Sequence, residues 1–212
     1  TAIGFIILSL GRAVCVWRFL NATKSSEPEK KSNNLRILLT WLFFFSVLQN
    51  GIIGVGSLLF ANNSQLLTWT LTISTVFLTL FATTSVYTCY YIFLPKFSAL
   101  PPTIAIFIFG AITTIVSMIT PQYPFINTSG GLDFGTPSSL AHLMYYLLLI
   151  AIGSVCAIFV QMTVKAKTRS TKITSFVIAL LAFVGIINIF IRLVILNINN
   201  NLLIRIFDTG IG

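Results

Sequence analysis

Long apolar runs separated by short polar stretches make up most of this chain. Six runs reach the length of about 20 residues that a helix needs to cross a bilayer. They cover residues 1–20, 36–60, 65–94, 101–120, 139–165 and 171–196, and a shorter seventh run covers 201–212. A chain in lipid must satisfy its own backbone hydrogen bonds, so such runs predict helices. We therefore expect an all-α fold, a polytopic transmembrane bundle with six full spans and a partial seventh, forming one domain over residues 1–212.

The stretches between the runs have the composition of linkers. Residues 21–35 are polar and charged, prolines surround the turn before residue 101, and residues 122–138 hold three glycines and two prolines. The first run contains Arg12 and Arg18 toward its end and lacks both a basic start and a small-residue cleavage site. It therefore predicts a retained helix rather than a signal peptide. The chain begins at Thr1 instead of Met, so we expect a processed or incomplete sequence.

The distribution of charge predicts the orientation. The chain is 56% hydrophobic and 8% charged, with a net charge of +9, whereas soluble domains carry about 25% charged residues. Ten basic residues surround the first, third and fifth linkers, and the second, fourth and sixth linkers contain none. The ten are Arg18, Lys24, Lys30, Lys31, Arg36, Lys96, Lys165, Lys167, Arg169 and Lys172. The positive-inside rule then places the N-terminus outside.

This placement of charge also indicates the partners. Basic residues in short linkers are suited to the anionic headgroups of the cytoplasmic leaflet, so nucleic acid is not expected as a partner. We expect a multi-pass protein of a bacterial plasma membrane that contacts another membrane or cytoplasmic protein.

Charged groups within the apolar runs are the first candidates for a functional site, because each costs about 2.5–3.5 kcal/mol at the centre of a span. Arg12 lies just past the middle of the first run, where it either snorkels toward the cytoplasmic face or serves a site. Arg192 shares a helical face with Asn188. Arg205 and Asp208 share a face of the terminal segment, where Asp208 would form an ion pair with Arg192 or Arg205, serve a ligand or ion site, or lie exposed at a frayed end.

Uncharged polar residues supply the remaining candidates. Gln49 and Asn50 precede Gly51, Gly54 and Gly56, which suggest a tight helix crossing or a helix irregularity. Together with Asn188, Gln49 and Asn50 predict a buried polar pocket. The run 65–94 is rich in Ser and Thr, which predicts a central helix whose hydroxyls hold the bundle together or line a polar path. His142, the only histidine, lies close to Tyr145 and Tyr146 at the outer surface, as part of an interfacial aromatic belt or as a pH-sensitive site.

No pattern in the sequence indicates catalysis. The chain lacks HExxH, GxSxG, Walker and paired-carboxylate motifs, and it has a single histidine. General acid–base chemistry therefore has few candidate residues, and no helix interior holds a lysine for a retinal Schiff base. We expect no enzyme, no catalytic residue, no cofactor and no metal site.

The order of runs and linkers resembles a known bacterial module. A basic first inner linker (NATKSSEPEKKSNNLR), a Gly-rich outer linker before the fifth run (GGLDFGTPSS) and a basic fifth linker (VKAKTRSTK) carry the resemblance. The architecture is similar to the seven-helix N-terminal membrane sensor module of bacterial histidine kinases. The resemblance implies a receptor-like bundle that perceives a signal and passes it to a cytoplasmic partner or domain. The alternatives are a non-catalytic accessory subunit of a larger membrane complex and a small transporter or channel.

Overall fold

A computed structural model describes residues 2–21, 30–120, 125–126, 132–133 and 137–197. In these ranges the chain folds into six long helices. They are α1 (Ala2–Asn21), α2 (Lys30–Leu59), α3 (Ser64–Phe93), α4 (Leu100–Ile119), α5 (Ser138–Lys165) and α6 (Arg169–Asn197). Two short antiparallel strands, β1 (Phe125–Ile126) and β2 (Leu132–Asp133), pair between α4 and α5. The all-α prediction is thus confirmed for the helices, with this small hairpin added outside the bundle.

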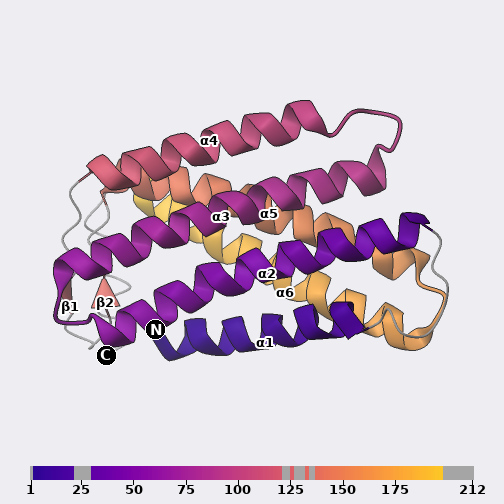
Figure 1. Cartoon of the computed structure of the whole chain (residues 1–212), viewed down its shortest axis with the longest axis horizontal. Helices are drawn as coiled ribbons and strands as arrows, with labels where there is room; N and C mark the ends of the chain where they lie inside the picture. Colours follow the sequence, from indigo (N-terminus) through magenta and orange to yellow (C-terminus); the bar gives the residue numbers. More distant parts are fainter. Residues whose placement is uncertain (1, 22–29, 121–124, 127–131, 134–136, 198–212) are drawn as a thin grey trace.

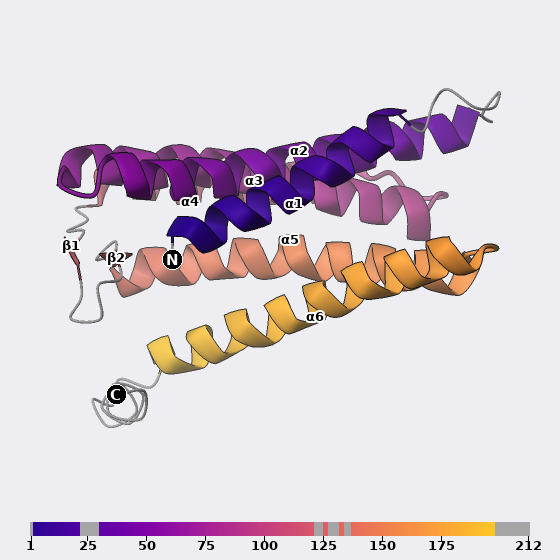
Figure 2. The ribbon, with the colours of Figure 1, turned by 90° about the horizontal axis from the view of Figure 1, so that it is seen from below.

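The helices form two layers (Figures 1 and 2). In one layer α1 packs on α2, α2 on α3 and α3 on α4; in the other, α6 packs on α5. The layers meet where α5 lies against α3 and α4. The predicted central position of the third helix is confirmed, because α3 contacts α2, α4 and α5, whereas α1 and α6 lie at the margins.

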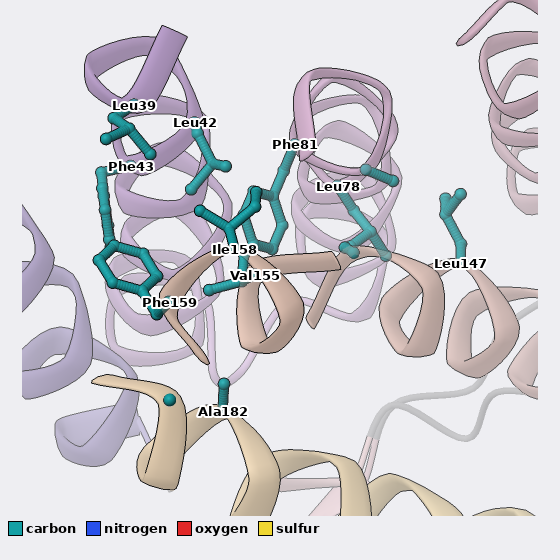
Figure 3. Close-up of a cluster of buried hydrophobic side chains, with 13 residues drawn as sticks. Leu39, Leu42, Phe43, Leu78, Phe81, Leu147, Val155, Ile158, Phe159 and Ala182 are labelled. Atoms are coloured by element: carbon teal, nitrogen blue, oxygen red, sulfur yellow. The ribbon is translucent and has the colours of Figure 1, made fainter. Parts of the chain in front are cut away.

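The buried apolar core lies between the layers. Figure 3 shows this cluster, to which α2, α3, α5 and α6 contribute fully or nearly buried side chains. Phe43 of α2 and Phe159 of α5 join the layers, with ring centroids 5.9 Å apart in an edge-to-face arrangement. Aromatic pairs in this geometry contribute about 0.5–1.5 kcal/mol beyond the area that they bury.

Glycines bring neighbouring helices of the first layer into close contact. A Cβ at Gly56 of α2 would lie 3.0 Å from Cβ of Thr70 in α3, and a Cβ at Gly110 of α4 would lie 2.8 Å from Cβ of Thr79 in α3. Small residues at helix crossings are the usual means of packing helices in lipid, where no hydrophobic force draws them together. The tight crossing predicted from the glycines of the second run therefore exists.

Among the described helices, five are long and apolar enough to cross a membrane, over Asn33–Leu59, Ser64–Phe93, Leu100–Ile119, Ser138–Lys165 and Arg169–Leu193. The sixth span, formed by α1, stays a prediction, as does the orientation. The partial seventh segment, 201–212, lies outside the described residues.

Most helix limits fall within two residues of the predicted ones, but the second helix does not. It begins at Lys30 instead of residue 36, so the linker predicted over 21–35 is too long. The polar residues at 30–34 form the first turns of α2, because hydropathy marks only the apolar part of a helix and not the polar turns that extend from it.

Candidate functional site

Polar side chains link α1 to α2. Ser9 of α1 donates a hydrogen bond from Oγ to the backbone oxygen of Val47 in α2, at 3.0 Å. Gly51 of α2 makes room for this contact, since a Cβ there would lie 3.1 Å from the Ser9 hydroxyl oxygen. The close approach of the two backbones places the next turn of α1, which carries Arg12, against α2.

The side chain of Arg12 is largely buried and turns toward α2. Its Nη1 lies 3.5 Å from the backbone oxygen of Ser46, a long hydrogen bond and its only described one. Helical side chains lean toward the N-terminal end of their helix, which for α1 is the end away from the basic linker. This contact does not extend the side chain toward the basic linker, as snorkelling would, and a role of Arg12 in a site stays a prediction.

Three buried polar residues of α2 surround this contact. Ser46, Gln49 and Asn50 are 1%, 8% and 5% exposed. Asn50 donates from Nδ2 to the backbone oxygen of Ser46 at 2.8 Å and to Oε1 of Gln49 at 3.1 Å. The hydroxyl oxygen of Ser46 is buried and has no hydrogen-bond partner among the described residues. We call Arg12, Ser46, Gln49 and Asn50 the α1–α2 polar cluster.

The electrostatic setting of the cluster is unusual. Ser46 is the central residue of the apolar stretch Asn33–Leu59, so Arg12 lies at the middle of the bundle's apolar length. None of the six described helices contains an acidic residue; the four in the chain are Glu27, Glu29, Asp133 and Asp208. The guanidinium group has five N–H donors, and one long bond to a carbonyl leaves most of this capacity unused. Within the described helices, no carboxylate balances the charge.

The structure separates Asn188 from the pocket predicted for it. Asn188 and Arg192 of α6 are both exposed, and Nε of Arg192 donates to Oδ1 of Asn188 at 3.2 Å. The prediction that Asn188 is buried with Gln49 and Asn50 is therefore wrong. The reason is that α6 packs chiefly on α5, turning small residues such as Ala179 and Ala182 inward and its polar pair outward.

Two other predicted site residues, Arg205 and Asp208, lie outside the described residues, and their ion pair stays a prediction.

His142 is partly exposed near the start of α5. Its Nδ1 lies 2.6 Å from the backbone oxygen of Ser138, and its ring lies 6.3 Å from that of Tyr146. The ring contact fits the aromatic-belt interpretation, and a pH-sensitive role stays a prediction.

Most buried hydroxyls of α3 bond within their own helix, and one reaches α4. Seven Ser and Thr residues of this helix are buried, and most of their hydroxyls bond to a backbone oxygen of the preceding turn, as Thr75 does with Leu71 at 2.9 Å. Thr72 also reaches α4, where its hydroxyl lies 3.2 Å from that of Ser117. Hydroxyls satisfied by their own helix do not line an open polar path.

Neither Ser9 nor Ser46 is predicted as a site residue from the sequence, and Arg12 has two interpretations there. Ser46 lies one helical turn before Asn50, so spacing alone places the two side chains on one face. That spacing is the signal that could have identified Ser46. In the described part of the chain, no group of three or more His, Cys, Asp or Glu residues could hold a metal ion.

Comparison with protein-family models, with curated proteins and with solved structures gives no match for this chain.

Proposed function

We propose that the protein is an integral membrane, receptor-like bundle that perceives a signal and passes it to a cytoplasmic partner or domain. The observation that carries this proposal is the α1–α2 polar cluster, with a guanidinium at the middle of the apolar length and no acidic residue in any described helix. Ionisable groups at such depth are costly and usually serve a function. A ligand with hydrogen-bond acceptors, or an anion, would supply what the cluster lacks.

The position of the cluster suggests how a signal would travel. Helix α1 packs chiefly on α2 and is held there by few polar contacts. A ligand that binds Arg12 and Ser46 would therefore compete with the contacts between these two helices. Rotation or tilt of α1 against α2 would then reach the cytoplasmic ends of both helices, since helices move as rigid elements. The basic residues at those ends would meet the cytoplasmic partner.

A second candidate, an accessory subunit of a membrane complex, is favoured by α6. This helix packs chiefly on α5, and large apolar side chains such as Phe176, Leu181 and Phe190 remain exposed along it. Another membrane protein could cover this surface. The transporter alternative gains no such support, because the hydroxyls of α3 bond within their own helix.

In-cell crosslinking distinguishes the two candidates. Tagged wild-type chain and Arg12→Gln would be expressed at equal levels, crosslinked at the cytoplasmic face, and the captured proteins identified. If the protein is a receptor, a cytoplasmic protein should be captured, and its yield should differ between Arg12→Gln and the wild type. The matched control is Arg192→Gln, which removes the same charge from an exposed position near the C-terminal end of α6, away from the basic linkers. Equal capture of a membrane complex by all three chains would instead identify an accessory subunit and refute the receptor proposal.

A further inference from the structure

A groove of about 390 Å³ lies between the cytoplasmic halves of α1 and α2, within the range of about 300–1,000 Å³ that is usual for ligand sites. Its wall is apolar: Val16 and Leu20 from α1, with Ile37, Trp41 and Phe44 from α2. Its polar lining comes from Arg36 and Thr40. We call this the inner groove; it is distinct from the α1–α2 polar cluster.

The cation lies at one end of the groove. Arg36 is near the start of the apolar stretch Asn33–Leu59, and Phe44 lies two turns deeper. Eight residues of helix span about 12 Å, slightly less than half of the hydrocarbon thickness of about 30 Å. The inner groove therefore fits within one leaflet, with its charge at the headgroup level and its apolar wall at the level of the acyl chains.

The guanidinium of Arg36 is held by one hydrogen bond among the described residues. Its Nη2 donates to Oδ1 of Asn33 at 2.5 Å, one of five N–H groups. Trp41 is 49% exposed and stacks on Phe45 with ring centroids 5.5 Å apart, which fixes the ring that forms the deeper wall. An arginine held in this way can bind a phosphate group through two parallel hydrogen bonds.

We infer that the inner groove binds an anionic phospholipid of the cytoplasmic leaflet, with its phosphate at Arg36 and one acyl chain along Val16, Leu20 and Trp41. Charge complementarity and the order of polar and apolar residues favour this occupant. A soluble anion would make no use of the apolar wall, and an apolar helix would leave the positive charge of the guanidinium without an anionic partner. The inference depends on membrane placement and not on the receptor role.

Native mass spectrometry of the 212-residue chain in detergent micelles tests this inference. Phosphatidylglycerol and phosphatidylcholine with identical acyl chains would be titrated separately and the bound molecules counted. We expect the wild type to prefer phosphatidylglycerol. Arg36→Gln should weaken phosphatidylglycerol binding about fivefold, the effect of one interfacial cation. It should weaken phosphatidylcholine binding less, because the choline group already neutralises the charge of that phosphate. The control Lys96→Gln removes a cation from the exposed turn between α3 and α4 and should change neither.

A second variant keeps the test decisive if Arg36→Gln fails to fold. Ile37→Trp fills the groove but keeps the cation, so it should weaken the binding of both lipids. Three results would overturn the inference: equal losses in Arg36→Gln and Lys96→Gln, unchanged binding in Ile37→Trp, or displacement of bound phosphatidylglycerol by glycerol 3-phosphate. The last result would assign the groove to a soluble phosphate.

Discussion

The contact between Gly110 of α4 and Thr79 of α3 gives the sharpest prediction about stability. Alanine at 110 would place its Cβ 2.8 Å from Cβ of Thr79 and 2.5 Å from Oγ1, and closer still to Cγ2. Ordinary contacts of a Cβ begin near 3.4 Å. The Cβ of Thr79 is fixed to the backbone, so a change of side-chain rotamer cannot relieve this contact. The helices α3 and α4 must instead move apart.

The cost can be isolated by comparison with Gly153 of α5, where an added Cβ meets no atom within 4 Å. Alanine is favoured over glycine in a helix by about 0.8–1.0 kcal/mol, and this gain is common to both substitutions. Overpacking a tight contact costs about 1–3 kcal/mol. We expect Gly153→Ala to stabilise the protein slightly, and Gly110→Ala to be about 1–3 kcal/mol less stable than Gly153→Ala.

The assay is reversible unfolding in mixed micelles by titration with sodium dodecyl sulfate, followed by far-UV circular dichroism. A third variant, Gly110→Ala with Thr79→Ala, removes the Cγ2 and Oγ1 atoms that crowd the new methyl group. Alanine at 110 should therefore cost less in the Thr79→Ala background than in the wild type, which a double-mutant cycle measures. Equal unfolding free energies for Gly110→Ala and Gly153→Ala would refute the close crossing of α3 and α4.

Three further predictions address the cluster, the α3–α4 contact and the orientation. Arg12→Leu should raise the free energy of unfolding by about 1–3 kcal/mol, because it removes a partly buried charge that no carboxylate in the described helices balances; Arg18→Leu should change it little, and a loss of stability in Arg12→Leu would make Arg12 structural. Thr72→Val should lower the free energy of unfolding by about 0.6 kcal/mol in the same assay, the mean for a hydrogen bond between membrane helices. An unchanged free energy of unfolding would show that Thr72 forms no stabilising hydrogen bond with α4. In a chain without native cysteines, Asn62→Cys should react with a membrane-impermeant maleimide in intact cells, and Lys167→Cys only after permeabilisation; the reverse would invert the predicted orientation.

Which helices form could be predicted from the sequence because the signal is local. An apolar run of about 20 residues has to satisfy its own backbone hydrogen bonds in lipid, and a helix is the only single segment that does so. Capping residues then mark some of the ends, as Asn63 does by accepting a hydrogen bond from the Leu66 backbone N–H at 3.0 Å. The start of α2 was missed because polar turns beyond the bilayer carry no hydropathy signal.

The inward face of each helix could not be predicted in the same way. Lipid is as apolar as a protein core, so buried and exposed positions of a membrane helix have similar side chains. In α6, Ile189 is buried and Ile187 is exposed, and nothing in their chemistry separates them. The same ambiguity explains why the sequence wrongly predicts that Asn188 lies in a buried pocket with Gln49 and Asn50.

For this protein the sequence by itself determined the class of fold, the number and extent of most helices, and the basic character of alternate linkers. Each of these depends on residues that are neighbours along the chain. Only the tertiary structure brought Arg12 of α1 to Ser46 of α2 and turned Asn188 of α6 away from both. Those placements depend on which helices pack together, and that is decided by the fit of small residues such as Gly51 and Gly110 against side chains distant in the sequence.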